Sequence, residues 1–249
     1  MIAISNLVKR YGSFTAVDGI SLDVAPGEIH GFLGPNGAGK TTTLRMIAGL
    51  LQPTSGQITV NGHDMAASPE QAKASLGFIP DRPFIYEKLT AGELLRFHGG
   101  LYGLDGDVDA RVREMLDLFE LRRWENELIE SFSHGMKQRL VMGSAFMHRP
   151  HAVAVDEPMV GLDPRGARLI KDVFRRMSER GVAILMSTHT LEVAQEMCHR
   201  VSIILKGRII AHGTVDEVVA QSGGEDTHLT SVFLKLTGGS GLQEIDEVV

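Results

Sequence analysis

The chain has 249 residues and a formal net charge of −6, with 43% hydrophobic and 22% charged residues. These proportions are those of an ordinary soluble globular protein, and a chain of this length can bury a sizeable core. The acidic balance argues against nucleic acid as the main partner, because phosphate backbones attract basic surfaces.

The sequence predicts neither a signal peptide nor a transmembrane segment. Its strongest apolar runs, at 46–51 and 182–186, are far shorter than the roughly 18 residues that span a bilayer. Residues 1–11 lack the charged, apolar and small-residue order of a secretory leader. The single cysteine, Cys198, cannot form an intrachain disulfide, which agrees with a reducing compartment.

Short strands and turns are expected in the N-terminal part. Alternating apolar residues predict strands at 2–9, 20–24 and 57–60, the last closed by the hairpin pair Asn61-Gly62. An apolar run at 29–33 leads into a glycine-rich loop, and residues 41–51 then show a helical pattern.

The middle of the chain is helical in pattern from about 90 to 147. Further on, short apolar runs at 152–155 and 182–186 predict buried parallel strands, and helical patterns follow at 165–179 and 191–198. We therefore predict an α/β fold with an N-terminal antiparallel β subdomain and a helical insertion at about 90–147. The domain is expected to cover 1–222, followed by a Gly/Ser/acid-rich tail at 223–249 with one apolar segment, 228–236.

A phosphate-binding loop is the strongest motif. The pattern G-x-x-x-x-G-K-[ST] is matched by Gly34-Pro35-Asn36-Gly37-Ala38-Gly39-Lys40-Thr41, with Thr42 next. Glycines let backbone N–H groups curl around phosphate oxygens, and the helix N-terminus adds positive charge. We expect Lys40 to contact the β- and γ-phosphates of ATP and the Thr41 hydroxyl to bind Mg²⁺. A glycine-rich turn that merely starts a helix is disfavoured, because a strand precedes the loop and a helix follows it.

Two carboxylates follow the predicted strand at 152–155. Asp156 is placed to hold Mg²⁺, directly or through water. Glu157 can take a proton from an attacking water molecule, a step worth about 10²–10⁴-fold in rate. Two solvated carboxylates at a strand end are the alternative, which the phosphate loop disfavours.

A further motif narrows the family. The segment Ser133-His134-Gly135-Met136-Lys137-Gln138-Arg139 resembles the signature sequence of ABC ATPases. Three other features stand in that family's order: Tyr11 before the phosphate loop, the D-loop Gly161-Leu162-Asp163 and the switch segment Ser187-Thr188-His189. The resemblance covers about residues 1–220 and implies the P-loop NTPase core of the ABC ATPase fold.

The resemblance also implies a head-to-tail dimer. Each ATP would lie between the phosphate loop of one copy and the signature residues Ser133, Gly135 and Met136 of the other. Ser133 can cap the following helix, whose N-terminus forms a second anion site. His189 would contact the γ-phosphate, Tyr11 would stack on adenine and Asp163 would belong to the D-loop at the dimer interface. In isolation a serine cap, a lone histidine or a lone tyrosine is more often structural.

The chain departs from the common family pattern at three positions. Asp81 stands where most ABC ATPases have glutamine, and its carboxylate is a candidate for contact with Mg²⁺ or the attacking water. His134 and Met136 stand where the commonest signature has glycine and glutamine. These features, with the residues at 80–90, resemble the ATPase subunits of type-two ABC exporters.

Such subunits work at the cytoplasmic face of the membrane with a separate membrane permease. The helical insertion and the loop at 81–97 would receive this partner through the apolar residues Phe84, Ile85, Tyr86, Leu94 and Phe97. The alternative is that these residues simply pack the insertion.

Three functions are compared. The first is an ATPase that powers export. The second is a soluble ABC ATPase that acts on nucleic acid or ribosomes, disfavoured because the chain lacks a long coiled-coil insertion, zinc cysteines and a second ATPase unit. The third is a regulatory subunit that does not hydrolyse ATP, disfavoured because Glu157 and His189 are both present.

Overall fold

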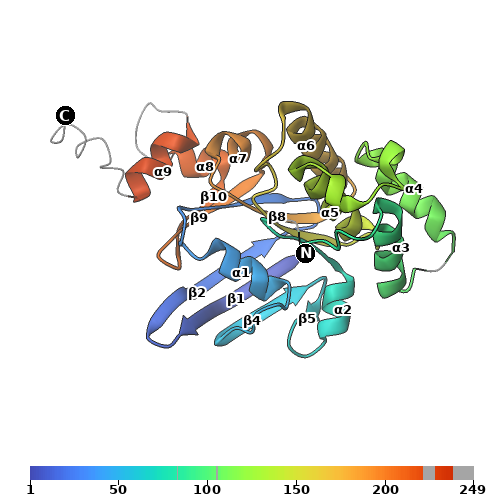
Figure 1. Cartoon of the computed structure of the whole chain (residues 1–249). Coiled ribbons are helices and arrows are strands. Elements are labelled where there is room, and N and C mark those ends of the chain that lie inside the picture. Colours follow the sequence, from blue (N-terminus) through green and yellow to red (C-terminus); the bar gives the residue numbers. More distant parts are fainter. Residues whose placement is uncertain (83, 105, 221–227, 238–249) are drawn as a thin grey trace.

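Two β-sheets with helices between and around them form the molecule (Figure 1). The computed structural model describes residues 1–82, 84–104, 106–220 and 228–237. Helix α1 (Lys40–Ile47) lies between the two sheets, and further helices cover the other face of the larger sheet (Figure 1). The predicted α/β fold with an N-terminal antiparallel part is confirmed.

The four-stranded sheet is antiparallel, in the order β2-β1-β4-β5. Its strands are β1 (Ile2–Tyr11), β2 (Phe14–Val24), β4 (Ser55–Val60) and β5 (His63–Asp64). The predicted hairpin joins β4 to β5, because Asn61 and Gly62 both adopt positive φ angles, 50° and 82°, as a tight hairpin turn requires.

The six-stranded sheet has the order β10-β9-β3-β8-β7-β6 and is parallel except for its edge strand β10. Its strands are β3 (Ile29–Leu33), β6 (Leu76–Ile79), β7 (Ala152–Asp156), β8 (Ala183–Thr188), β9 (Arg200–Leu205) and β10 (Arg208–Thr214). Strands β3, β8 and β7 are neighbours, so their carboxyl ends meet at one edge, which is where open α/β sheets bind ligands.

The predicted helical stretch contains α3 (Ala91–Leu101), α4 (Val108–Leu118) and α5 (His134–Phe146), with two 3₁₀ turns at Arg122–Trp124 and Ile129–Ser131. The other helices are α2 (Pro69–Ala74), α6 (Pro164–Glu179), α7 (Leu191–Met197), α8 (Val215–Ala220) and α9 (Leu229–Thr237). Helices α3 and α4 form a lobe at one end of the molecule, and α7, α8 and α9 lie at the opposite end (Figure 1). The domain boundaries stay a prediction.

Two hydrophobic cores hold these layers together. One fills the space between the sheets around α1 and includes Phe32 and Leu44. The other joins the large sheet to the helices and includes Met186 and Phe174, both fully buried. Because α1 is buried in the first core, the phosphate loop that precedes α1 is held in place between the two sheets.

Some elements differ from the sequence-based expectations. The helix expected at 41–51 ends at Ile47, because Gly49 adopts a left-handed φ of 64° that ends a helix. The hairpin β9–β10 was not predicted, although the turn residues Lys206 and Gly207 between two apolar runs could have indicated it. The apolar tail segment forms α9, whereas 223–227 and 238–249 lie outside the described residues. In the described part of the chain, the helices are too short or too polar to cross a membrane.

Candidate nucleotide-binding site

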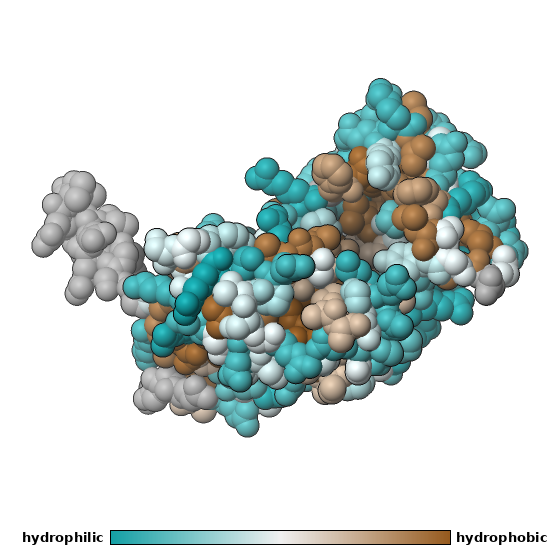
Figure 2. Space-filling view, turned by 90° about the horizontal axis from the view of Figure 1, so that it is seen from below, coloured by the Kyte–Doolittle hydropathy of each residue, from teal (hydrophilic) through white to brown (hydrophobic). Residues whose placement is uncertain are grey.

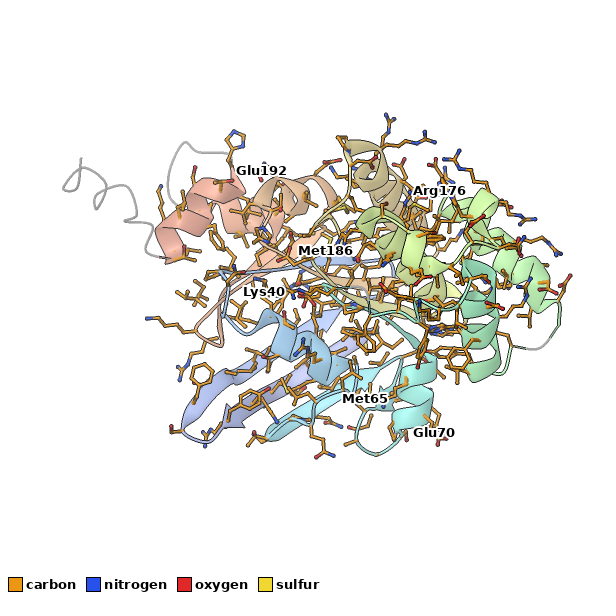
Figure 3. All side chains as sticks on the ribbon, viewed as in Figure 1. Lys40, Met65, Glu70, Arg176, Met186 and Glu192 are labelled. Carbon is orange, nitrogen blue, oxygen red and sulfur yellow. The ribbon has the colours of Figure 1, made fainter. Side chains whose placement is uncertain are left out.

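The phosphate loop connects β3 to α1. Lys40 is only 6% exposed, and its Nζ donates hydrogen bonds to the carbonyl oxygens of Gly34 at 2.6 Å and Pro35 at 3.3 Å. Gly39, at the helix N-cap with φ 114°, has no side chain, so the first N–H groups of α1 are available to an anion. In Figure 3 Lys40 lies in the middle of the molecule, where α1 begins beneath the larger sheet.

Glycine is required here by close packing. A β-carbon at Gly34 would lie 2.4 Å from the Ile204 carbonyl oxygen, and one at Gly39 would lie 2.7 Å from the Ala16 carbonyl oxygen. Neither neighbour is a flexible side-chain end, so any larger residue would displace the loop. The backbone is thereby held close around the space in front of Lys40.

Burial lowers the pKa of Lys40, while the nearby carboxylates Glu157 and Asp156 act in the opposite direction. A bound phosphate would add negative charge beside the ammonium group and favour its protonated form. Lys40 is therefore a desolvated ammonium group whose protonated form a bound anion would stabilise.

Asp156, 2% exposed at the end of β7, meets two hydroxyl groups. Its Oδ2 accepts a hydrogen bond from Thr41 Oγ1 at 2.6 Å, and its Oδ1 accepts one from the buried Ser187 hydroxyl. Neighbouring carboxylate and hydroxyl oxygens are the ligands that Mg²⁺ prefers. Two of the three residues predicted to hold a metal, Thr41 and Asp156, are brought together although they are 115 positions apart in sequence, and the third, Asp81, lines the same cavity.

Glu157 adopts a positive φ of 50°, which is unusual for a residue with a side chain and is concentrated at functional sites. Its N–H donates to the Ser187 carbonyl at 3.1 Å, and its Oε1 lies 2.9 Å from Nδ1 of His189. The carboxylate side chain is 15% exposed and the imidazole 57% exposed. This pair provides a proton acceptor with a second group that orients it.

A cavity of about 360 Å³ lies in front of the loop, within the range of small-molecule sites. It is lined by Tyr11, Phe14, Ala16, residues 35–42, Asp81, Asp156 and Glu157. Tyr11 and Phe14 are opposite one another in the β1–β2 register, and 50% and 63% exposed. The sequence reasoning singled out Tyr11 and missed Phe14, which stands across the same hairpin turn.

The signature residues lie elsewhere. Ser133 caps α5, its Oγ accepting from the Met136 N–H at 3.3 Å, as the sequence predicts for an N-cap. Asp163 likewise caps α6, its Oδ1 accepting from the Gly166 N–H at 2.7 Å. The described residues that line the cavity include none from 133–136 and neither Asp163 nor His189.

The expected partner groove is a second cavity, of about 300 Å³, whose lining includes Leu50, Phe78, Pro80, Phe84, Ile85, Tyr86, Leu94 and Tyr102. Phe84 is 95% exposed and Tyr86 60%. Phe97 lies outside this lining but contacts Tyr86 edge to face at 5.8 Å. Leu94 lines the groove but is only 1% exposed and packs in the core, so for this residue the structure favours the alternative, packing of the insertion. Figure 2 shows apolar side chains on both sides of a hollow between the body and the helical lobe.

Comparison with known proteins agrees with this geometry. The family described as ABC transporter matches residues 17–160. The chain belongs to this family. As a member, it binds and hydrolyses ATP.

Among its relatives is the linearmycin resistance ATP-binding protein LnrL of Bacillus subtilis (strain 168), 39% identical over 226 residues, which are 90% of this chain and 73% of the relative. A solved ATP-binding subunit of an ABC transporter is 33% identical, with a TM-score of 0.89 over 95% of this chain and 99% of the other. A dimeric ATP-binding cassette, MJ0796, solved with ADP and Pi, shares the fold at 23% identity and a TM-score of 0.78, covering 86% of this chain and 98% of the other.

Proposed function

We propose that this ABC ATPase subunit powers export through a separate membrane permease, by closing with a second copy of itself around two ATP molecules. The linearmycin resistance relative supports the export role, and the dimeric cassette with ADP and Pi supports pairing of two copies.

One observation carries the dimer proposal. The chain builds two sites suited to an anion, one at the phosphate loop and one at the Ser133-capped start of α5, and the second does not line the first cavity. One γ-phosphate does not need two such sites on a single copy. A head-to-tail arrangement brings the second site of one copy to the ATP of the other.

The oxygen donors of Thr41 and Asp156 fit Mg²⁺, and we propose that these two residues hold it. Mg²⁺ would neutralise charge on the β- and γ-phosphates. Asp81 lines the same cavity and is a third candidate oxygen donor. Lys40 and the N–H groups of α1 would bind the phosphates. The Glu157 carboxylate would accept a proton from the attacking water, and His189 would hold that carboxylate and contact the γ-phosphate.

The groove is proposed to receive a cytoplasmic helix of the permease, which places this subunit at the cytoplasmic face of the membrane. Its exposed aromatic residues are typical of interface anchors. Glu87, in the loop that carries Phe84 and Tyr86, forms an ion pair with Lys137 of α5. A helix seated in the groove would thus act on the signature segment through this loop.

The dimer is tested with the Glu157→Gln variant, which should bind ATP, hydrolyse it about 10²–10⁴-fold more slowly, and elute as a dimer when ATP is added. Adding Ser133→Arg should abolish the dimer and leave nucleotide binding to the monomer unchanged, whereas Ser55→Arg, at the exposed start of β4, should change neither. Hydrolysis at the normal rate in Glu157→Gln would exclude Glu157 as the base.

The partner is tested by purifying the tagged chain from native membranes and identifying what accompanies it. A stoichiometric multi-helix membrane protein, lost on Phe84→Asp substitution, is expected. Recovery with ribosomes or nucleic acid and without a membrane protein would replace export by the alternative, a soluble ABC ATPase.

A further inference from the structure

The histidine of the signature segment lies against the loop that follows Glu157. A β-carbon built on Gly161 would lie 2.4 Å from Cδ2 and 2.7 Å from Nε2 of the His134 ring. A β-carbon on Gly135, which follows His134 in α5, would lie 3.6 Å from both the Gly161 carbonyl oxygen and Leu162 Cδ2. The first turn of α5 and this loop therefore pack together, and the imidazole fills the space that a side chain at Gly161 would need.

The loop itself is short and internally bonded. The Val160 N–H donates to the Glu157 carbonyl at 3.2 Å, and the Leu162 N–H to the Met159 carbonyl at 3.4 Å. Gly161 has a φ of 76°, a conformation that favours glycine. At its far end Asp163 caps α6. A contact at Gly161 thus lies within a short segment that begins at Glu157, the proposed base, and ends at the N-cap of α6.

The two sides of this contact serve different ATP molecules under the proposed function. Ser133 and Gly135, which flank His134, would face the ATP held by the other copy. Glu157 would face the ATP held by its own copy. The His134 ring on Gly161 is therefore a direct connection, within one chain, between the two composite sites.

We propose that His134 is a positioning residue that fixes the signature segment against the 157–163 loop, so that both elements meet the second copy as one preformed surface. A glycine, which the commonest signature has at this position, could not make the contact because it has no atoms beyond its backbone. A surface that is already ordered loses less conformational entropy on association. The inference rests on the proposed dimer.

The first test uses Glu157→Gln as the background and measures dimer formation against ATP concentration by light scattering. His134 is the first residue of α5, and alanine is a good helix former, so His134→Ala leaves the helix intact. We expect the half-maximal ATP concentration for dimer formation to rise about tenfold, the size of coupling found between contacting residues. Binding of ATP to the monomer should be unchanged. The control variant His63→Ala, on β5 of the four-stranded sheet, should need the same ATP concentration for dimer formation as the Glu157→Gln background.

The second test is a double-mutant cycle with Gly161→Ala. In the presence of His134 the added methyl group meets both the ring and an unfavourable φ angle, whereas with His134→Ala only the φ strain remains. Gly161→Ala should therefore impair dimer formation less in the His134→Ala chain.

The outcomes separate the inference from the proposed function. If Glu157→Gln never dimerises with ATP, the dimer proposal itself fails. If the dimer forms but His134→Ala needs no more ATP for dimer formation than the Glu157→Gln background, only the role of His134 is overturned. The same holds if Gly161→Ala impairs dimer formation equally with and without His134→Ala. A loss of ATP binding by the His134→Ala monomer would also overturn it, because the contact would then act on the chain's own phosphate site.

Discussion

Removal of the Ser187 hydroxyl tests how the two carboxylates are held. Ser187 is fully buried on β8, and its hydroxyl donates to Oδ1 of Asp156 on the neighbouring strand. In Ser187→Ala this bond is lost, whereas Oδ2 keeps the hydrogen bond from Thr41. The Glu157 N–H loses its 3.3 Å bond to the Ser187 hydroxyl but keeps its 3.1 Å bond to the backbone carbonyl of residue 187.

The expected magnitude follows from the charge of the acceptor. A hydrogen bond to a charged group contributes about 1.5–3 kcal/mol, and Asp156 is too buried for water to replace the donor. The free energy of unfolding without Mg²⁺ should fall by this amount. Loss of a group that orients a proposed metal ligand should reduce Mg²⁺ affinity or ATPase activity about 10–100-fold.

The matched control is Ser144→Ala. Ser144 is also buried, but its hydroxyl donates at 2.8 Å to the Val141 carbonyl within its own helix. Denaturant unfolding and ATPase rates over a Mg²⁺ titration compare the two variants. Ser144→Ala should cost about 0.5–1.5 kcal/mol and leave the Mg²⁺ dependence unchanged. If Ser187→Ala gives that same result, Ser187 does not orient the carboxylate.

Three further predictions concern other parts of the chain. Gly34→Ala should lower the free energy of unfolding by about 1–3 kcal/mol and weaken ATP binding in a nucleotide titration, because the added methyl group meets the Ile204 carbonyl. An unchanged affinity for ATP would contradict this prediction. Burial lowers the pKa of the His148 imidazole from 6.5 to about 4 in the folded chain. Between pH 6.5 and 4 the imidazole is therefore protonated in the unfolded chain but not in the folded one, so the free energy of unfolding falls as the pH is lowered through this range. The melting temperature of His148→Gln should fall less steeply over that window, and equal slopes would refute the reasoning. Gln138 is 1% exposed, and neither of its amide atoms has a hydrogen-bond partner among the described residues. Gln138→Met should therefore raise the free energy of unfolding by about 1 kcal/mol in denaturant, whereas a decrease would mean that the amide is bonded.

Much of the site was readable from the sequence because its geometry depends on adjacent residues. The phosphate loop needs glycines, a lysine and a hydroxyl within one strand–loop–helix unit, and the residues at 34–41 supply them in order. The cap at Ser133 and the position of Asp156 at a strand end are local in the same way. The carboxylates, the signature and the loop were therefore all predicted from motifs.

The tertiary structure alone decided which of these residues meet. The sheet order β3-β8-β7 brings Thr41 to Asp156, and Glu157 to His189, and no local pattern encodes the order of strands. Phe14 joined the cavity only because the β1–β2 register places it opposite Tyr11. The contact of His134 with Gly161 joins two motifs that the sequence presents as separate, because packing between distant segments is set by the whole core.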